Sequence, residues 1–205
     1  MRLIDITPAV SPALEGWPGD TRFESVPRWS QAHGDSCTVA RVTLSSHLGA
    51  HADAPRHFRA DGADAASLPL EPYLGPARVV QCPGAGAIGP EEAARAAGAE
   101  RVLYRVLPPG AERGFPRAFA ALTPAGARAL VRLGLRLFGT DAPSVDPVDS
   151  RTLEAHHALE RGGVAILEGL ALAEVPAGEY DLIALPLKWR DVDAAPVRAV
   201  LRTRD

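Results

Sequence analysis

The chain has little cysteine and no long apolar run. Cys37 and Cys82 are its two cysteines among 205 residues, so the sequence contains neither a disulfide framework nor a cysteine-rich zinc site. The sequence contains no run of about 18 apolar residues, the length that a membrane-spanning helix needs. The N-terminus reaches Asp5 before the core of a signal peptide could form. We therefore expect a cytoplasmic protein in a reducing compartment.

An excess of charge of one sign is also missing. The 22 Lys and Arg residues against 25 Asp and Glu give a net charge of -3 and no electrostatic reason to expect nucleic acid or an anionic membrane as a partner. A small molecule is the expected partner. With 46% apolar and 23% charged residues, the composition is typical of a globular chain, and we expect one domain over residues 1–205.

Short β-prone segments alternate with helical segments along the chain. The helix between Thr123 and Gly134 has the clearest signals, because Thr123 suits the N-cap, Pro124 the first turn and Gly134 the end. The alternation predicts an α/β fold with parallel or mixed strands. The stretch up to Gly34 is rich in proline and is expected to be a loop-rich arm over a site or a neighbouring subunit. Strands are expected at 38–44, 78–80, 101–104, 135–138, 164–167, 182–187 and 197–201, and the other helices at 90–97 and 152–161.

Three of the six histidines and one aspartate lie within eleven residues. Imidazole and carboxylate are the ligands that borderline cations such as zinc prefer, and His51 and Asp53 project to the same side of an extended segment. A lone histidine in a loop is more often solvated. The density of His47, His51, Asp53 and His57 instead predicts a metal site. A purely structural zinc site is the less favoured alternative, because such sites mostly use cysteine.

A second pair, His156 and His157, lies on an expected helix. On a helical wheel His156 falls between two leucines of the apolar stripe, so His156 is the better inward ligand, although a core histidine bonded to a carbonyl is the alternative for it. Glu168 follows a buried strand, where a carboxylate needs a partner such as a cation. Asp141, after another strand, is a weaker candidate of the same kind.

The first histidine cluster resembles a family signature. Residues 47–58 match the pattern HxGTHxDxPxHF of the cyclase-type metal-dependent hydrolases, with Ala50 where many relatives have Thr, and are most similar to those of the bacterial kynurenine formamidases. Segments 4–7, 17–20, 138–141 and 166–170 also resemble family segments. The resemblance implies a compact cyclase-like fold with a mixed β-rich core flanked by helices, assembled as a homodimer.

The resemblance also implies two zinc ions in each subunit. His47, His51 and Asp53 would hold the first zinc ion, Asp53 and Glu168 would bridge, and His156 would help to hold the second. His57 corresponds to the family's proton donor and acceptor.

The implied reaction is hydrolysis of N-formyl-L-kynurenine to L-kynurenine and formate, an arylformamidase step of tryptophan breakdown. Trp17 would line the substrate pocket, where its flat face suits ring stacking. Two alternatives remain open: hydrolysis of another cyclic or aryl amide such as isatin, and a non-catalytic metal-binding module. His33 and His157 have no assignment.

Overall fold

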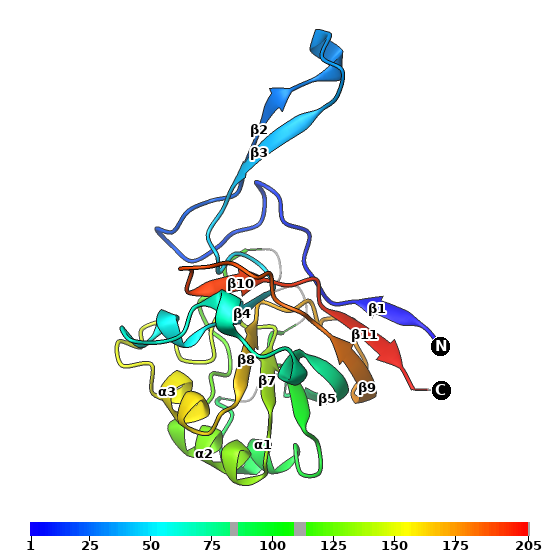
Figure 1. Cartoon of the computed structure of the whole chain (residues 1–205). Helices are drawn as coiled ribbons and strands as arrows, with labels where there is room; N and C mark the ends of the chain where they lie inside the picture. The colour runs from blue at the N-terminus through cyan, green and yellow to red at the C-terminus, as the bar shows by residue number, and fades with distance from the viewer. Residues whose placement is uncertain (83–85, 109–113, 205) are drawn as a thin grey trace.

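One curled, mixed sheet lies at the centre of the protein (Figure 1). The computed structural model describes residues 1–82, 86–108 and 114–204. Strands β5 to β8 are parallel and the flanking strands antiparallel, which confirms the predicted α/β class. In spatial order, the sheet contains β1 (Leu3–Asp5), β11 (Val200–Thr203), β9 (Gly178–Ile183), β5 (Leu74–Gln81), β6 (Arg101–Arg105), β7 (Leu137–Thr140), β8 (Ala165–Glu168), β4 (His51–Asp53) and β10 (Ala194–Pro196).

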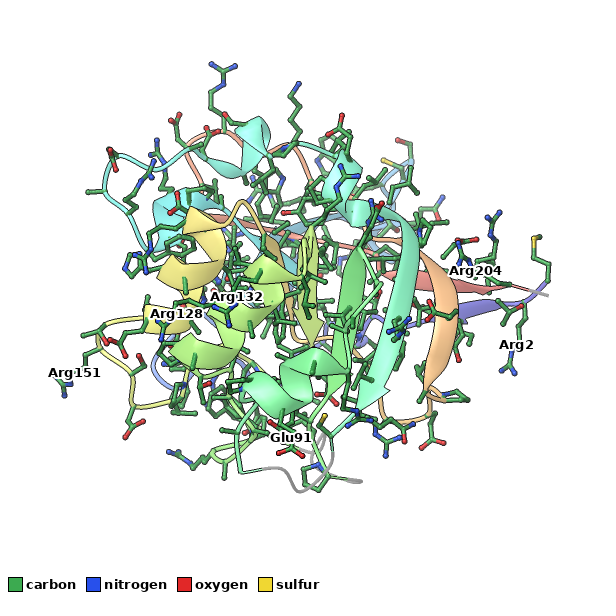
Figure 2. All side chains as sticks on the ribbon, turned by 90° about the horizontal axis from the view of Figure 1, so that it is seen from below. Arg2, Glu91, Arg128, Arg132, Arg151 and Arg204 are labelled. Carbon is green, nitrogen blue, oxygen red and sulfur yellow. The ribbon has the colours of Figure 1, made fainter. Side chains whose placement is uncertain are left out.

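Three helices pack together on one face of the parallel strands. They are α1 (Pro90–Ala94), α2 (Pro124–Arg132) and α3 (Glu154–Arg161). The Thr123 side chain accepts a hydrogen bond from the N–H of Gly126 at 3.0 Å and so caps α2, as the sequence predicts. Figure 2 views this helical layer, with Arg128 and Arg132 of α2 among its exposed side chains.

The sheet separates two apolar cores. Along β6, Val102 and Tyr104 face the helices, whereas Leu103 lies in the core on the other side of the sheet, and all three are fully buried. A parallel strand with both faces covered reads as a continuous apolar run, which is why β6 and β7 are recognisable from sequence. The buried strands give a rigid base for the groups at their carboxyl ends.

A separate two-stranded hairpin projects from the body (Figure 1). It consists of β2 (Glu24–Trp29) and β3 (Val39–Thr43), with the short 3₁₀ helix Gln31–His33 at its tip. The N-terminal stretch is therefore not only the expected loop: β1 and β2 lie within it. Strand β3 confirms the strand expected at 38–44, whereas β2 is exposed on both faces and lacks the apolar alternation that sequence patterns detect.

Several predicted boundaries are wrong by a few residues. The strand expected at 182–187 is β9 at 178–183, because this segment pairs between β5 and β11 and leaves the sheet before Pro186. The strand expected at 197–201 begins at Val200. The loop expected to carry the first histidine cluster contains β4. In the described residues, no helix is long and apolar enough to span a membrane.

Candidate metal centre

Two antiparallel strands place the first three polar groups. In the pairing of β4 with β8, His51 stands directly opposite Glu168. Asp53 is two residues beyond His51 in β4, so both side chains project to the same side of the sheet. Each of these three residues is at most 5% exposed. Strand register alone therefore gathers an imidazole and two carboxylates in a buried place.

Two glycines allow the loop before β4 to reach this place. Gly49 has a φ of 75°, a conformation that glycine adopts without strain, and its carbonyl lies 2.9 Å from Nδ1 of His51. A side chain at Gly169 would meet the carbonyl oxygen of Gly49 at 2.3 Å, so the chain after Glu168 also requires glycine. The hydrogen bond to Gly49 leaves Nε2 of His51 directed at the carboxylates.

Helix α3 supplies the second imidazole. Asp146 accepts hydrogen bonds from the backbone N–H groups of Ala155 and His156 in the first turn, at 3.0 and 3.1 Å. Its carboxylate also lies 2.6 Å from Nδ1 of the His156 ring. One carboxylate therefore fixes both the start of α3 and the ring orientation of His156, and it leaves Nε2 of that ring to face Asp53 and Glu168.

The distances within the cluster suit metal coordination. Oδ1 of Asp53 lies 3.3 Å from Nδ1 of His47 and 3.4 Å from Nε2 of His51. Oδ2 of the same carboxylate lies 3.3 Å from Nε2 of His156. A tetrahedral ion that holds its ligands at about 2.0 to 2.1 Å separates them by about 3.3 to 3.4 Å. Asp53 thus presents Oδ1 to the imidazoles of His47 and His51, and Oδ2 to the imidazole of His156.

Glu168 likewise faces both halves of the cluster. Its Oε2 lies 3.4 Å from Nε2 of His51, and its Oε1 lies 3.4 Å from Nε2 of His156. Oε1 also accepts a hydrogen bond from the N–H of Val145 at 2.7 Å, which orients the carboxylate. Two overlapping ligand groups share Asp53, one of His47, His51 and Asp53 and the other of Asp53, His156 and Glu168. A third candidate group, less buried, consists of His47, His57 and Asp193.

Four buried polar atoms of this cluster have no hydrogen-bond partner among the residues that the structure describes. They are Nε2 of His51, Nε2 of His156 and both carboxylate oxygens of Asp53. A buried polar atom without a partner is costly, and native proteins rarely leave several side by side. Divalent cations would satisfy all four atoms at once, so the residues fit a metal centre.

The pKa values show how strongly this place favours positive charge. Burial lowers the pKa of His51, but the carboxylates of Asp53 and Glu168 outweigh burial and raise it to about 10. Burial raises the pKa of Asp53, but the surrounding imidazoles hold it well below its usual range. The negative field that retains protons on the imidazoles is the field that a cation would neutralise.

His57 lies beside the cluster on its open side. The 3₁₀ helix Pro55–His57 follows β4 and brings its ring to 4.2 Å from the His47 ring, centroid to centroid. Nδ1 of His57 approaches Oδ2 of Asp193 at 3.5 Å, and the same oxygen lies 3.0 Å from Nε2 of His47. His57 is therefore positioned by a carboxylate while it remains partly exposed to the cavity.

The cluster opens into a cavity of about 520 Å³. Trp17 and Phe115 contribute aromatic wall, with their rings edge to face at 5.2 Å. Glu15 accepts a hydrogen bond from the N–H of Phe115 at 3.0 Å and joins the N-terminal arm to the loop that carries this residue. Asp141 lies in the cavity wall and outside both ligand groups.

The structure brings all seven sequence-predicted site residues to this cavity or its floor. His156 rather than His157 faces the cluster; the His157 ring contacts Phe58 instead. The sequence analysis does not predict two further carboxylates of the site, Asp146 and Asp193. Asp193 precedes β10, and only the pairing of β10 with β4 carries it to His47. Asp146 has no signal in the sequence beyond its distance of ten residues from His156.

The fold and the cluster define an α/β protein with a candidate metal centre, lined by histidine and carboxylate groups, beneath a partly apolar cavity. The Cyclase family model matches residues 4–147, and the chain belongs to this family.

Solved structures of similar proteins cover nearly the whole chain. A potential metal-dependent hydrolase with cyclase activity is 26% identical, with a TM-score of 0.86 over 100% of this chain and 98% of the other. A predicted metal-dependent hydrolase from Bacillus stearothermophilus is 26% identical, with a TM-score of 0.83 over 98% of this chain and 97% of the other. Isatin hydrolase A from Labrenzia aggregata, at 24% identity and a TM-score of 0.81 over 99% and 94%, shares the fold.

Proposed function

We propose that the protein is a zinc-dependent amidohydrolase that cleaves N-formyl-L-kynurenine to L-kynurenine and formate. The observation that carries this proposal is the position of His57. Its ring lies beside the His47 ring and outside the two ligand groups that share Asp53. It also lines the cavity, whose wall includes aromatic side chains. The similarity to metal-dependent hydrolases at 26% identity supports the reaction class. The substrate rests on the resemblance of residues 47–58 to the kynurenine formamidases.

His47, His51 and Asp53 would hold one zinc ion, and Asp53, His156 and Glu168 the other. When bound, zinc supplies a water ligand of lowered pKa and stabilises charge on a carbonyl oxygen. Imidazole and carboxylate are suitable ligands, and their four unpartnered atoms point into the cluster.

His57 would move the proton that amide cleavage requires. The aniline nitrogen of an aryl formamide leaves only when it is protonated, and an imidazole can accept a proton from water and donate it there. Asp193 approaches Nδ1 of His57, so Nε2 is the atom left for exchange with substrate. Trp17, on the cavity wall, would stack on the aryl ring, which typically contributes about 0.5 to 1.5 kcal/mol.

Hydrolysis of N-formylkynurenine, followed by the absorbance of free kynurenine, tests the proposal. We expect turnover by the zinc-loaded protein and its loss after chelation, with recovery on adding zinc. His57→Ala should lose most turnover and retain both zinc ions, whereas His33→Ala, an exposed histidine at the hairpin tip, should retain both activity and metal. Equal turnover with and without metal would refute the metal mechanism. Loss of zinc from His57→Ala would make His57 a ligand, with His47 and Asp193.

A cyclic amide such as isatin is the second candidate substrate. The fold shared with isatin hydrolase A is the reason to include isatin in the assay. Faster turnover of isatin than of N-formylkynurenine would replace the first substrate by the second. Absence of turnover on both, with two zinc ions bound, would favour the non-catalytic metal-binding module.

We also propose that the protein is a homodimer held by the β2–β3 hairpin. An isolated two-stranded hairpin is marginally stable in water, and this one exposes Trp29 by 57% and Val42 by 50%. A second copy of the chain is the partner that covers it. Light scattering should give twice the chain mass of 21.6 kDa, and Trp29→Ser should shift the mass towards the monomer. A monomer at micromolar concentration would refute the dimer.

A further inference from the structure

Asp141 is a buried carboxylate that the metal centre does not use. It follows β7 directly and is 7% exposed, and it lines the same cavity as His57 and Trp17. Its Oδ1 accepts hydrogen bonds from the N–H groups of Val106 at 2.8 Å and Leu107 at 3.3 Å. Two backbone donors therefore fix the carboxyl group on the wall before any ligand enters.

Asp141 is not paired with a cation in the part of the chain that the structure describes, although the charge of Arg105 acts on its carboxyl. No Lys, Arg or His nitrogen of these residues forms a salt bridge with it. Burial raises the pKa of its carboxyl to about 6, and the hydrogen bonds from Val106 and Leu107 and the charge of Arg105 only partly oppose this. A buried carboxylate without a paired cation is costly, and a ligand that carries a cation would remove that cost.

The rest of the cavity wall points to the same kind of ligand. No Lys or Arg occurs among the described residues that line it, and the other acidic lining groups are exposed or already bound. Glu168 and Asp193 contact the histidine cluster, Glu15 bonds to Phe115, and Asp20 is exposed and bonds to the N–H of Thr21. Asp141 is therefore the described buried carboxylate of the cavity that lies outside the histidine cluster, and its hydrogen bonds are to the backbone N–H groups of Val106 and Leu107 alone.

We propose that Asp141 recognises an ammonium group on the substrate, so that the enzyme prefers aryl amides that carry a cationic amine. This inference rests on the proposed amide hydrolysis and names the substrate class within it. Asp141 acts in specificity: it binds a group remote from the scissile bond and takes no part in proton transfer there. A hydrogen bond to a charged partner in a partly dehydrated cavity is stronger than one between neutral groups.

Two substrates that differ in one charge test this assignment. One is a formanilide whose ring carries an aminoethyl group, and the other is its propyl analogue of the same shape. We expect the zinc-loaded protein to favour the ammonium substrate by about 10- to 100-fold in kcat/KM, mainly through KM. Asp141→Asn should abolish this preference and leave kcat/KM for the propyl analogue within about 3-fold.

Asparagine keeps an oxygen that can accept from Val106 and Leu107, so the variant removes the charge and retains the loop contacts. The matched control is Asp20→Asn, which removes an exposed carboxylate of the same cavity and should leave the preference unchanged. Zinc content and melting temperature are measured on both variants. A purely structural role of Asp141 would lower kcat/KM equally for both substrates. An equal loss of kcat/KM on both substrates in Asp141→Asn would overturn the assignment, and so would an unchanged kcat/KM on both. A wild-type protein that does not prefer the ammonium substrate would also overturn it.

Failure of the proposed function is distinguishable from failure of this inference. Should the wild-type protein hydrolyse neither formanilide, calorimetry measures the binding of phenethylamine and propylbenzene-type analogues to the zinc-loaded protein. Tighter binding of the amine that Asp141→Asn abolishes would support the assignment without any turnover. Equal binding of the amine and the neutral analogue would refute it.

Discussion

Removal of the charge on Asp146 should weaken metal binding although Asp146 is not itself one of the proposed ligands. Its carboxylate lies 2.6 Å from Nδ1 of His156 and also accepts from two backbone N–H groups at the start of α3. As long as Nδ1 carries the proton, Nε2 keeps its lone pair for a metal ion. Asp146 is therefore a positioning residue for His156.

Asp146→Asn creates a conflict that the structure makes explicit. If the amide NH₂ faces the ring, Nδ1 must accept, and the proton moves to Nε2, where it blocks coordination. If the amide oxygen faces the ring instead, the NH₂ meets the backbone N–H of Ala155, which is also a donor. A charge-assisted hydrogen bond is lost either way, which costs about 1.5 to 3 kcal/mol and lowers affinity about 10- to 100-fold.

Competition between the protein and a chromophoric chelator for zinc measures this change. We expect one weakened zinc site in Asp146→Asn and one of wild-type affinity, because His47 and His51 do not contact Asp146. Asp149→Asn, an exposed carboxylate of the same loop, is the control and should bind zinc as the wild type does. Unchanged affinity at both sites of Asp146→Asn would show that Asp146 does not position His156, and an equal loss at both would indicate general unfolding.

Three further outcomes follow from the site. Gly49→Ala forces a φ of 75° on a residue with a side chain, so we expect a loss of about 1 to 2 kcal/mol in the free energy of unfolding, measured with urea; an unchanged free energy would contradict the required glycine. The carboxyl of Asp141 has a folded-state pKa of about 6, above its unfolded value, so the folded state binds more protons and wild-type stability should fall as pH rises from about 4 to 6. Asp141→Asn should remove this decrease in stability. A variant with the same pH profile as the wild type would show that another group causes the decrease. Trp17→Ala should raise KM for aryl formamides several-fold at unchanged zinc content, and a pure kcat effect would exclude ring stacking.

Local periodicity was enough to predict much of the site. His51 and Asp53 are two residues apart in an extended segment, so their common direction follows from strand geometry. Glu168 lies at the end of a buried strand that composition marks clearly. The 3.6-residue period separates His156 from its neighbour His157. These inferences hold because each depends only on residues within one element.

The features that the sequence does not predict depend on contacts between separate elements, which local sequence patterns do not reveal. Asp193 reaches His47 because Asp53 pairs with Ala194, about 140 residues further along the chain. Asp146 reaches His156 because the loop before α3 folds back on the first helical turn. Strand β2 is exposed on both faces, so it has no apolar stripe to detect, although its partner β3 is predicted at 38–44. Each omission reflects either a contact between separate segments of the chain or a strand without a buried face.

The N-terminal arm links the cavity to the projecting hairpin. A side chain at Gly49 would contact Val10 and Leu14 at 3.4 Å, so the arm packs directly on the loop between two predicted zinc ligands. The arm continues into β2, and β3 ends at Thr43, a few residues before His47. A partner that orders the hairpin would therefore restrain the loop of the proposed ligands in two ways, through the connection from β3 and through the arm packed on Gly49. If the hairpin holds a second copy of the chain, dimer formation and cavity shape are physically coupled, and Trp29→Ser should raise KM as well as lower the mass.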